Sequence, residues 1–82
     1  MASLRVLNWS GDTKITYDVE RAATGDMEAV AAIQEAERIF QEERARGATA
    51  FRVLPGVPAE RIDSFDRAAE QIVMVPRVAG GA

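Results

Sequence analysis

Few side chains in this sequence can perform covalent or metal chemistry. Cysteine and histidine are both absent from the 82 residues. The chain therefore lacks a thiolate nucleophile, an imidazole base and the two most common zinc ligands. Asp63 and Asp66 lie close together in the sequence, but two carboxylates fall far short of the oxygen ligand set of a hard cation. The sequence predicts a protein that is not an enzyme and that has no metal site and no cofactor.

The remaining candidate residues are suited to being bound or modified. Lys14 is the only lysine, so it is either the acceptor of an isopeptide bond or an exposed residue on a polar strand face. Trp9 is the only tryptophan and is either a partner anchor or a partly buried side chain at the end of a sheet. Gly80 and Gly81 are either a tail that is activated through its carboxylate or a flexible terminus. Arg77, just before them, is either a recognition residue for the tail or a solvated charge.

The elements that must position these residues begin with two strands. Residues 3–9 and 13–19 alternate between apolar and polar side chains, and a turn sequence with a glycine separates them. They predict a hairpin in which Ile15, Tyr17 and Val19 face the same side. Residues 20–25 show no clear period, and we predict a loop there.

Residues 27–46 carry the strongest periodic signal of the chain. Val30, Ile33, Ala36 and Phe40 recur at helical spacing, and the charged residues lie mostly away from this apolar stripe. Asp26 is typical of a helix N-cap, and Gly47 is typical of the residue that ends a helix. The sequence predicts a long amphipathic helix with one buried face.

The C-terminal half predicts two more strands. Residues 48–54 form one strand, with Phe51 and Val53 facing inward. Prolines and glycine follow, and we expect residues 59–66 to form an irregular segment or a short turn. Residues 71–76 form the last strand, and its uninterrupted apolar run predicts a position in the sheet interior, parallel to the first strand.

Together these elements predict one α+β domain over residues 1–77, with a flexible glycine tail at residues 78–82. The architecture is a two-layer ββαβ(turn)β arrangement with one helix on a four-stranded mixed sheet. Period-2 and period-3.6 spacing assign one shared core. The predicted core residues are Leu4, Val6, Ile15, Tyr17, Val30, Ile33, Phe40, Phe51, Val53, Ile72 and Met74.

Charge and hydropathy exclude two classes of partner. The formal net charge is −3 and the pI is near 4.9, whereas a nucleic-acid-binding domain normally carries a basic patch and a high pI. No apolar run approaches the ~20 residues of a membrane-spanning helix. Residues 1–5 lack the apolar stretch of a secretory signal. We expect a cytoplasmic protein that binds neither nucleic acid nor a membrane.

The predicted order of elements resembles that of the ubiquitin-like β-grasp superfamily. Residues 75–81, with the sequence Val-Pro-Arg-Val-Ala-Gly-Gly, are similar to the end of the sulfur-carrier subunit of molybdopterin synthase and of thiamin-type carriers and prokaryotic ubiquitin-like modifiers. Phage tail-assembly proteins of the β-grasp type end in a similar Pro-Val-Ala-Gly stretch. The resemblance in sequence covers these residues alone, and the resemblance in element order covers most of the chain.

The resemblance implies a ubiquitin-like protein modifier or a sulfur carrier. A separate adenylating enzyme would join the C-terminal glycine carboxylate to the α-phosphate of ATP, and glycine would be required where the tail passes close to the nucleotide. Such a carrier ends at the second glycine, so Ala82 is either trimmed by a protease or an added cloning residue. The alternative is a non-enzymatic interaction module, such as a small phage or prophage assembly protein.

Overall fold

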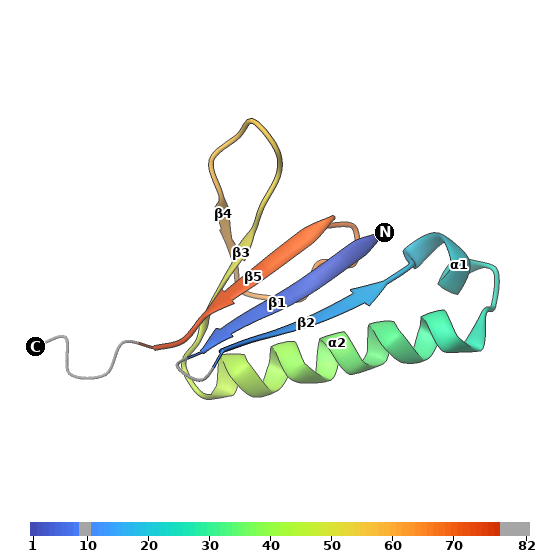
Figure 1. Cartoon of the computed structure of the whole chain (residues 1–82), viewed down its shortest axis with the longest axis horizontal. Coiled ribbons are helices and arrows are strands. Elements are labelled where there is room, and N and C mark those ends of the chain that lie inside the picture. The colour runs from blue at the N-terminus through green and yellow to red at the C-terminus, as the bar shows by residue number, and fades with distance from the viewer. Residues whose placement is uncertain (9–10, 78–82) are drawn as a thin grey trace, which may run out of the picture.

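The structure is a computed structural model in which residues 1–8 and 11–77 are described. One long helix packs on a mixed sheet of five strands, so the predicted α+β class is confirmed (Figure 1). The elements in chain order are β1 (Ala2–Asn8), β2 (Gly11–Tyr17), α1 (Val19–Ala23), α2 (Met27–Ala45), β3 (Thr49–Arg52), β4 (Glu60–Ile62) and β5 (Gln71–Val75).

The strands lie in the order β2-β1-β5-β3-β4. β1 pairs antiparallel with β2 and parallel with β5, and β3 pairs antiparallel with both β5 and β4. The prediction that the last strand lies inside the sheet, parallel to the first, is confirmed. The prediction of four strands is wrong, because β4 forms where we expected an irregular segment. β4 has only three residues, Glu-Arg-Ile, which is too short for its alternation to be recognised.

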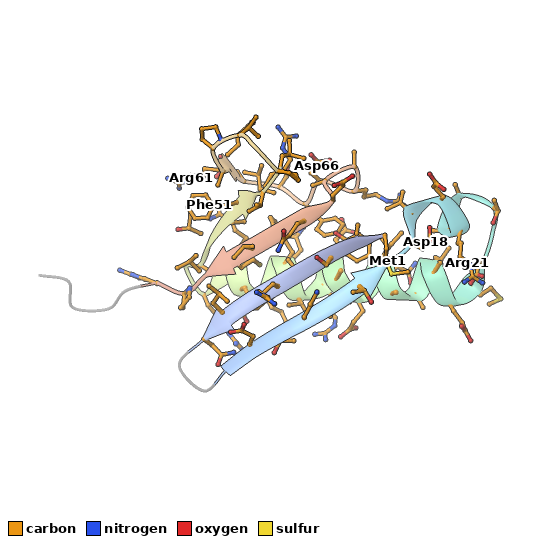
Figure 2. The ribbon with its side chains drawn as sticks, turned by 45° about the horizontal axis from the view of Figure 1, so that its top comes forward. Met1, Asp18, Arg21, Phe51, Arg61 and Asp66 are labelled. Carbon is orange, nitrogen blue, oxygen red and sulfur yellow. The ribbon has the colours of Figure 1, made fainter. Side chains whose placement is uncertain are left out.

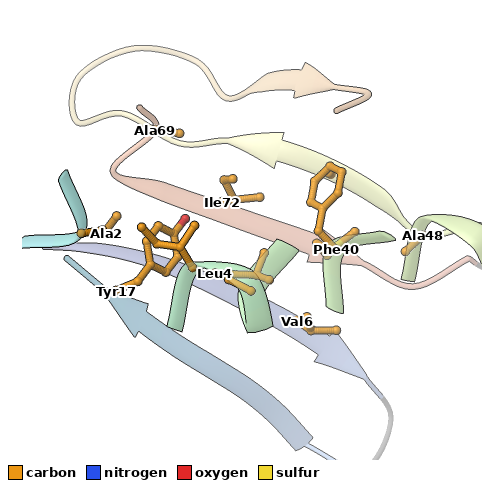
Figure 3. Close-up of a cluster of buried hydrophobic side chains, with 13 residues drawn as sticks. Ala2, Leu4, Val6, Tyr17, Phe40, Ala48, Ala69 and Ile72 are labelled. Atoms are coloured by element: carbon orange, nitrogen blue, oxygen red, sulfur yellow. The ribbon is translucent and has the colours of Figure 1, made fainter. Parts of the chain in front are cut away.

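The buried side chains form one cluster between the sheet and α2, on what we call the inner face (Figure 3). Seven predicted core residues are confirmed as buried, and Ile15 and Val30 pack partly buried against them. The predicted core contains none of the buried alanines of this cluster, because alanine gives no strong periodic signal. The buried residues are Ala2, Leu4, Val6, Tyr17, Ala22, Ile33, Ala36, Phe40, Ala48, Ala50, Ala69, Ile72 and Met74.

The predicted start of the long helix is confirmed, and the helix ends at Ala45, one residue before the predicted end, with Arg46 as the C-cap. The Asp26 carboxylate accepts a hydrogen bond from the Ala29 N–H at 3.1 Å, which satisfies one free donor of the first turn. The same hydrogen bond lowers the pKa of Asp26. At the other end, Gly47 has a φ of +97°, a conformation that suits glycine after a helix C-cap. The Ala48 N–H then donates to the Glu43 carbonyl at 2.9 Å.

The predicted loop at residues 20–25 is wrong, because a short helix, α1, occupies most of it. Asp18 is its N-cap and accepts a hydrogen bond from the Arg21 N–H at 3.1 Å. Val19, predicted to continue the second strand, begins this helix instead. Arg21 also pairs with Asp26 at 2.9 Å, which joins the first helix to the cap of the second.

The predicted orientation of β3 is also wrong. Ala48 and Ala50 are buried, whereas Phe51 and Val53 are half-buried and lie outside the core cluster. Ala50 lies directly opposite Met74, which faces the core, and Phe51 lies opposite Val73 on the other side of the sheet. Small side chains on the inner face leave the space that the larger side chains of β5 and α2 fill.

The segment between β4 and β5 completes the inner face. The Phe65 ring contacts those of Tyr17 and Phe40, with centroids 5.9 and 5.7 Å apart. Arg52 donates to Asp66 at 3.0 Å and to Glu60 at 2.7 Å, which ties this segment to β3 and β4. Neither helix in the described part of the chain combines the length and the apolar composition that a bilayer crossing requires.

Candidate functional site

The candidate site is the face of the sheet that α2 does not cover. We call it the outer face. One row of directly opposite residues crosses all five strands on this face. In sheet order the row is Lys14, Arg5, Val73, Phe51 and Arg61. Cations therefore stand at both ends of the row and apolar side chains stand in its centre.

The apolar centre of the outer face extends beyond this row. Leu7 on β1, Val75 on β5 and Val53 after β3 alternate with inward-facing residues and are half-buried. Phe51 and Arg61 lie beside each other on neighbouring strands, which Figure 2 labels. Half-buried apolar side chains at the centre, with polar groups around them, are the usual composition of a protein–protein contact surface.

The cations of the outer face are weakly paired. Arg5 lies 3.7 Å from Asp12, and Arg61 lies 3.9 Å from Asp63, both in exposed surroundings where such pairs contribute little. Lys14 lies directly opposite Arg5 on the neighbouring strand. Like charges in opposite positions destabilise a sheet. The arrangement therefore suits the binding of an anionic partner better than it suits the stability of the domain.

The predicted tail-adjacent residue lies at the end of β5. Arg77 is exposed, and the aliphatic part of its side chain lies against Gly47 after α2. Gly80 and Gly81, the predicted activation tail, lie outside the described residues. The predicted partner anchor Trp9 also lies outside them.

Lys14, the predicted isopeptide acceptor, is exposed on β2. Its side chain belongs to the outer face, so it lies on the same surface as Val73 and Phe51. From the sequence alone, Lys14 is an isolated residue. The pairing of the strands shows that it lies on the same face of the sheet as Arg5 and Arg61.

The two aspartates considered for a cation are engaged separately. Asp63 interacts with Arg44 at 3.4 Å, whereas Asp66 accepts a hydrogen bond from Arg52. Among residues 1–8 and 11–77, no group of three or more acidic side chains converges into a metal site. A hollow of about 370 Å³ between α1 and the start of β5 is also lined by carboxylates. Within the described residues, these carboxylates likewise do not form a group of three that could hold a metal ion.

Tyr17 is the buried residue with the most unusual electrostatic environment. Its hydroxyl is buried and has no hydrogen-bond partner among the described residues. Burial raises the pKa of the Tyr17 phenol, and the nearby Asp66 carboxylate raises it further. The phenol thus stays protonated. The nearby Asp66 carboxylate accepts a hydrogen bond from Arg52 and none from the phenol, so it does not activate Tyr17 as a nucleophile.

No protein-family model, curated protein or solved structure matches this chain. The assignment of a function therefore rests on the geometry of the chain itself.

The outer face is not recognisable as a site from the sequence alone. Its central residues are apolar, and local patterns place such residues in the core or in a strand that is covered on both sides. The signal that could have found it is the alternation in β3, where Ala48 and Ala50 take one side and Phe51 and Val53 take the other. Only the register across β3 and β5 decides which side faces the helix.

Proposed function

We propose that the protein is a ubiquitin-like modifier or sulfur carrier of the β-grasp type, whose C-terminal glycine carboxylate is activated by a separate adenylating enzyme. The observation that carries the proposal is the position of β5. The last strand lies in the middle of the sheet, parallel to β1 and with β3 on its other side. The last described residues of the chain therefore follow a central strand of the sheet, and this strand contributes side chains to the outer face.

The outer face supports the proposal because it supplies a docking surface next to the exit of the chain. Val73 and Val75 belong both to β5 and to this surface. An enzyme that binds the outer face would hold the strand from which the tail continues. The cations Arg5, Lys14 and Arg61 favour an enzyme surface that carries carboxylates around an apolar centre.

The proposed reaction takes place on the tail and not on a side chain of the domain. The carboxylate of Gly81 attacks the α-phosphorus of ATP, an acyl-adenylate forms, and pyrophosphate leaves. The chain is the substrate of this step, and the adenylating enzyme supplies the catalytic groups.

The decisive experiment compares chains that end at Gly81 and at Ala82. Each is incubated with ATP and the purified adenylating enzyme encoded nearest to its gene, and intact mass is measured. We expect an adenylate or thioester only for the chain that ends at Gly81. The matched control is Gly81→Ala in that shorter chain, which adds a methyl group at the reacting residue. Equal reaction of this variant, or an inert Gly81 form, would exclude the modifier function.

A second pair of variants tests the docking surface. Phe51→Ala removes an apolar side chain from the outer face, and Met27→Ala removes an exposed one from the start of α2. We expect Phe51→Ala to raise the KM for activation and Met27→Ala to leave it unchanged. The same KM for both variants would exclude the outer face as the docking surface.

The second candidate function is a non-enzymatic interaction module, for example in phage or prophage assembly. The hairpin of β3 and β4 supports it, because its loop projects away from the rest of the domain (Figure 1). Leu54 and Val57 in this loop are 38 % and 54 % exposed. An exposed apolar loop on a projecting hairpin is suited to insertion into a partner.

The test is co-expression with the products of neighbouring genes, followed by size-exclusion chromatography. A stoichiometric complex that the double variant Leu54→Ser/Val57→Ser loses would support the interaction module. Activation of the chain ending at Gly81, with no such complex, would support the modifier instead.

A further inference from the structure

The side chain of Arg77 lies across a residue that has no side chain. Gly47 follows the C-cap of α2, and its φ of +97° is a conformation that L-residues with a Cβ adopt only rarely. A Cβ at this position would lie 3.0 Å from Cδ of Arg77 and 3.5 Å from its Cβ. Such an approach is closer than ordinary van der Waals contact, so a side chain at position 47 would force the Arg77 stem to shift by a few tenths of an ångström.

The other described glycines with positive φ differ from Gly47 in this respect. Gly11, Gly25 and Gly56 have φ values of +131°, +91° and +77°. A Cβ on any of the three would meet no atom within 4 Å. Glycine is needed there for the backbone alone, whereas at Gly47 it also leaves the space that Arg77 occupies.

The two ends of the Arg77 side chain have different surroundings. The aliphatic stem packs on Gly47, but the guanidinium forms no hydrogen bond or ion pair with any of residues 1–8 and 11–77. A cation beside the C-terminal end of a helix is favourable, because the last carbonyl groups carry partial negative charge. A stem that packs on the backbone, with a guanidinium that no described residue pairs, lowers the conformational entropy that a partner must remove on binding.

We propose that Gly47 is a positioning residue for Arg77, holding its guanidinium ready for a carboxylate on the enzyme that activates the tail. This inference rests on the proposed function. It assigns a recognition role to the end of α2, which is distant in the sequence from the tail. Arg77 makes the contact with the enzyme, and Gly47 acts only through Arg77.

The contact itself is tested by NMR on the full chain, without any partner. We expect cross peaks between the Gly47 Hα protons and the Arg77 Hβ and Hδ protons. Gly47→Ala should shift the Arg77 side-chain resonances, and Gly25→Ala should leave them unchanged. Gly25→Ala is the matched control, because it imposes the same kind of backbone strain at a similar φ with no neighbouring side chain. Absence of the cross peaks would overturn the proposal.

The recognition role is tested by ATP–pyrophosphate exchange with chains ending at Gly81 and the adenylating enzyme encoded nearest to the gene. We expect Arg77→Ala and Gly47→Ala to raise the KM about three- to tenfold with little change in kcat, as for a misaligned charge-assisted hydrogen bond. Gly25→Ala should leave KM unchanged. In the Arg77→Ala background, Gly47→Ala should have no further effect, which a merely structural role would not produce.

The outcomes separate this inference from the proposed function. If wild-type chains exchange pyrophosphate but Gly47→Ala and Gly25→Ala have the same KM, the positioning role is overturned and the modifier function stands. Additive effects of Gly47→Ala and Arg77→Ala would also overturn it. If no wild-type chain is activated while the NMR contact is present, the modifier function fails, and the contact between Arg77 and Gly47 has only a packing role.

Discussion

The inner and outer faces of the sheet are built from neighbouring residues of the same strands, yet they have opposite properties. On the inner face, Leu4, Ile72 and Met74 are fully buried. On the outer face, the neighbouring residues Arg5 and Val73 are only partly covered, and Arg5 stands opposite another cation. The inner face is organised for stability, whereas the outer face keeps features that reduce stability. Under the proposed function, the composition of the outer face serves binding, and this difference can be tested one residue at a time.

The largest expected effect is on the inner face at Phe40. This side chain is 1 % exposed and contacts the Phe65 ring edge to face. Phe40→Ala should lower the free energy of unfolding by about 3–5 kcal/mol, because it leaves a cavity under α2. Urea unfolding followed by circular dichroism measures this loss. A variant that unfolds at the same urea concentration as the wild type would contradict the assigned core.

The next test concerns which side of β3 faces the helix. Ala50 is fully buried, whereas Phe51 lies on the outer face. Ala50→Leu should destabilise the domain by about 1–3 kcal/mol through overpacking. Phe51→Leu, an apolar exchange on the half-covered side, should cost less than about 1 kcal/mol. The reverse order of the two urea midpoints would reverse the assignment of the faces.

A smaller effect is expected at the Tyr17 hydroxyl. Tyr17→Phe removes a buried group with no partner among the described residues, so stability at neutral pH should stay equal or rise by up to about 1 kcal/mol. The pKa of Tyr17 is raised in the folded state. Stability should therefore be fully present below the unfolded value of about 10 and decline as pH rises through the folded value.

Tyr17→Phe should lack this alkaline decline. Tyr17 is the only tyrosine, so the phenolate absorbance of the wild type reports on this residue alone. A loss of more than about 1 kcal/mol in Tyr17→Phe at neutral pH would mean that the hydroxyl has a partner.

The smallest effect on stability is expected on the outer face at Lys14. Lys14→Glu replaces a like charge opposite Arg5 with an opposite one, which should raise stability by roughly 0.2–1 kcal/mol. Under the proposed function, the same change should weaken activation by the adenylating enzyme, because the outer face loses a cation. Thermal unfolding and the KM of activation measure the two effects. A less stable variant, or one with an unchanged KM, would contradict the claim that the outer face favours binding at the expense of stability.

Most of the fold could be predicted from the sequence, because its main elements are long and periodic. The long helix with its N-cap Asp26 and the terminating Gly47, the first hairpin and the central position of β5 all followed from local patterns. The errors occurred where local patterns were short or ambiguous. β4 and α1 have three and five residues, so neither completes enough periods to be recognised. Asp18 was an available N-cap signal for α1.

The candidate site was less predictable, because it depends on register between distant strands. Phe51 alternates with Ala50 in any strand, but only the pairing with Met74 and Val73 decides which of them is buried. The row from Lys14 to Arg61 likewise exists only after five strands are aligned. The contact between Arg77 and Gly47 joins residues that are far apart in the chain and depends on tertiary structure alone.

The central position of β5 also determines how the domain responds to mechanical force. β1 begins at Ala2 and β5 ends at Val75, and the two strands are parallel neighbours. A pull between the two ends of the domain therefore loads their hydrogen bonds in shear, so that they must break together and not one after another. On its other side β5 is also bonded to β3. An unfolding machine that grips the chain beyond Arg77 would meet its strongest resistance at the first strand it tries to extract.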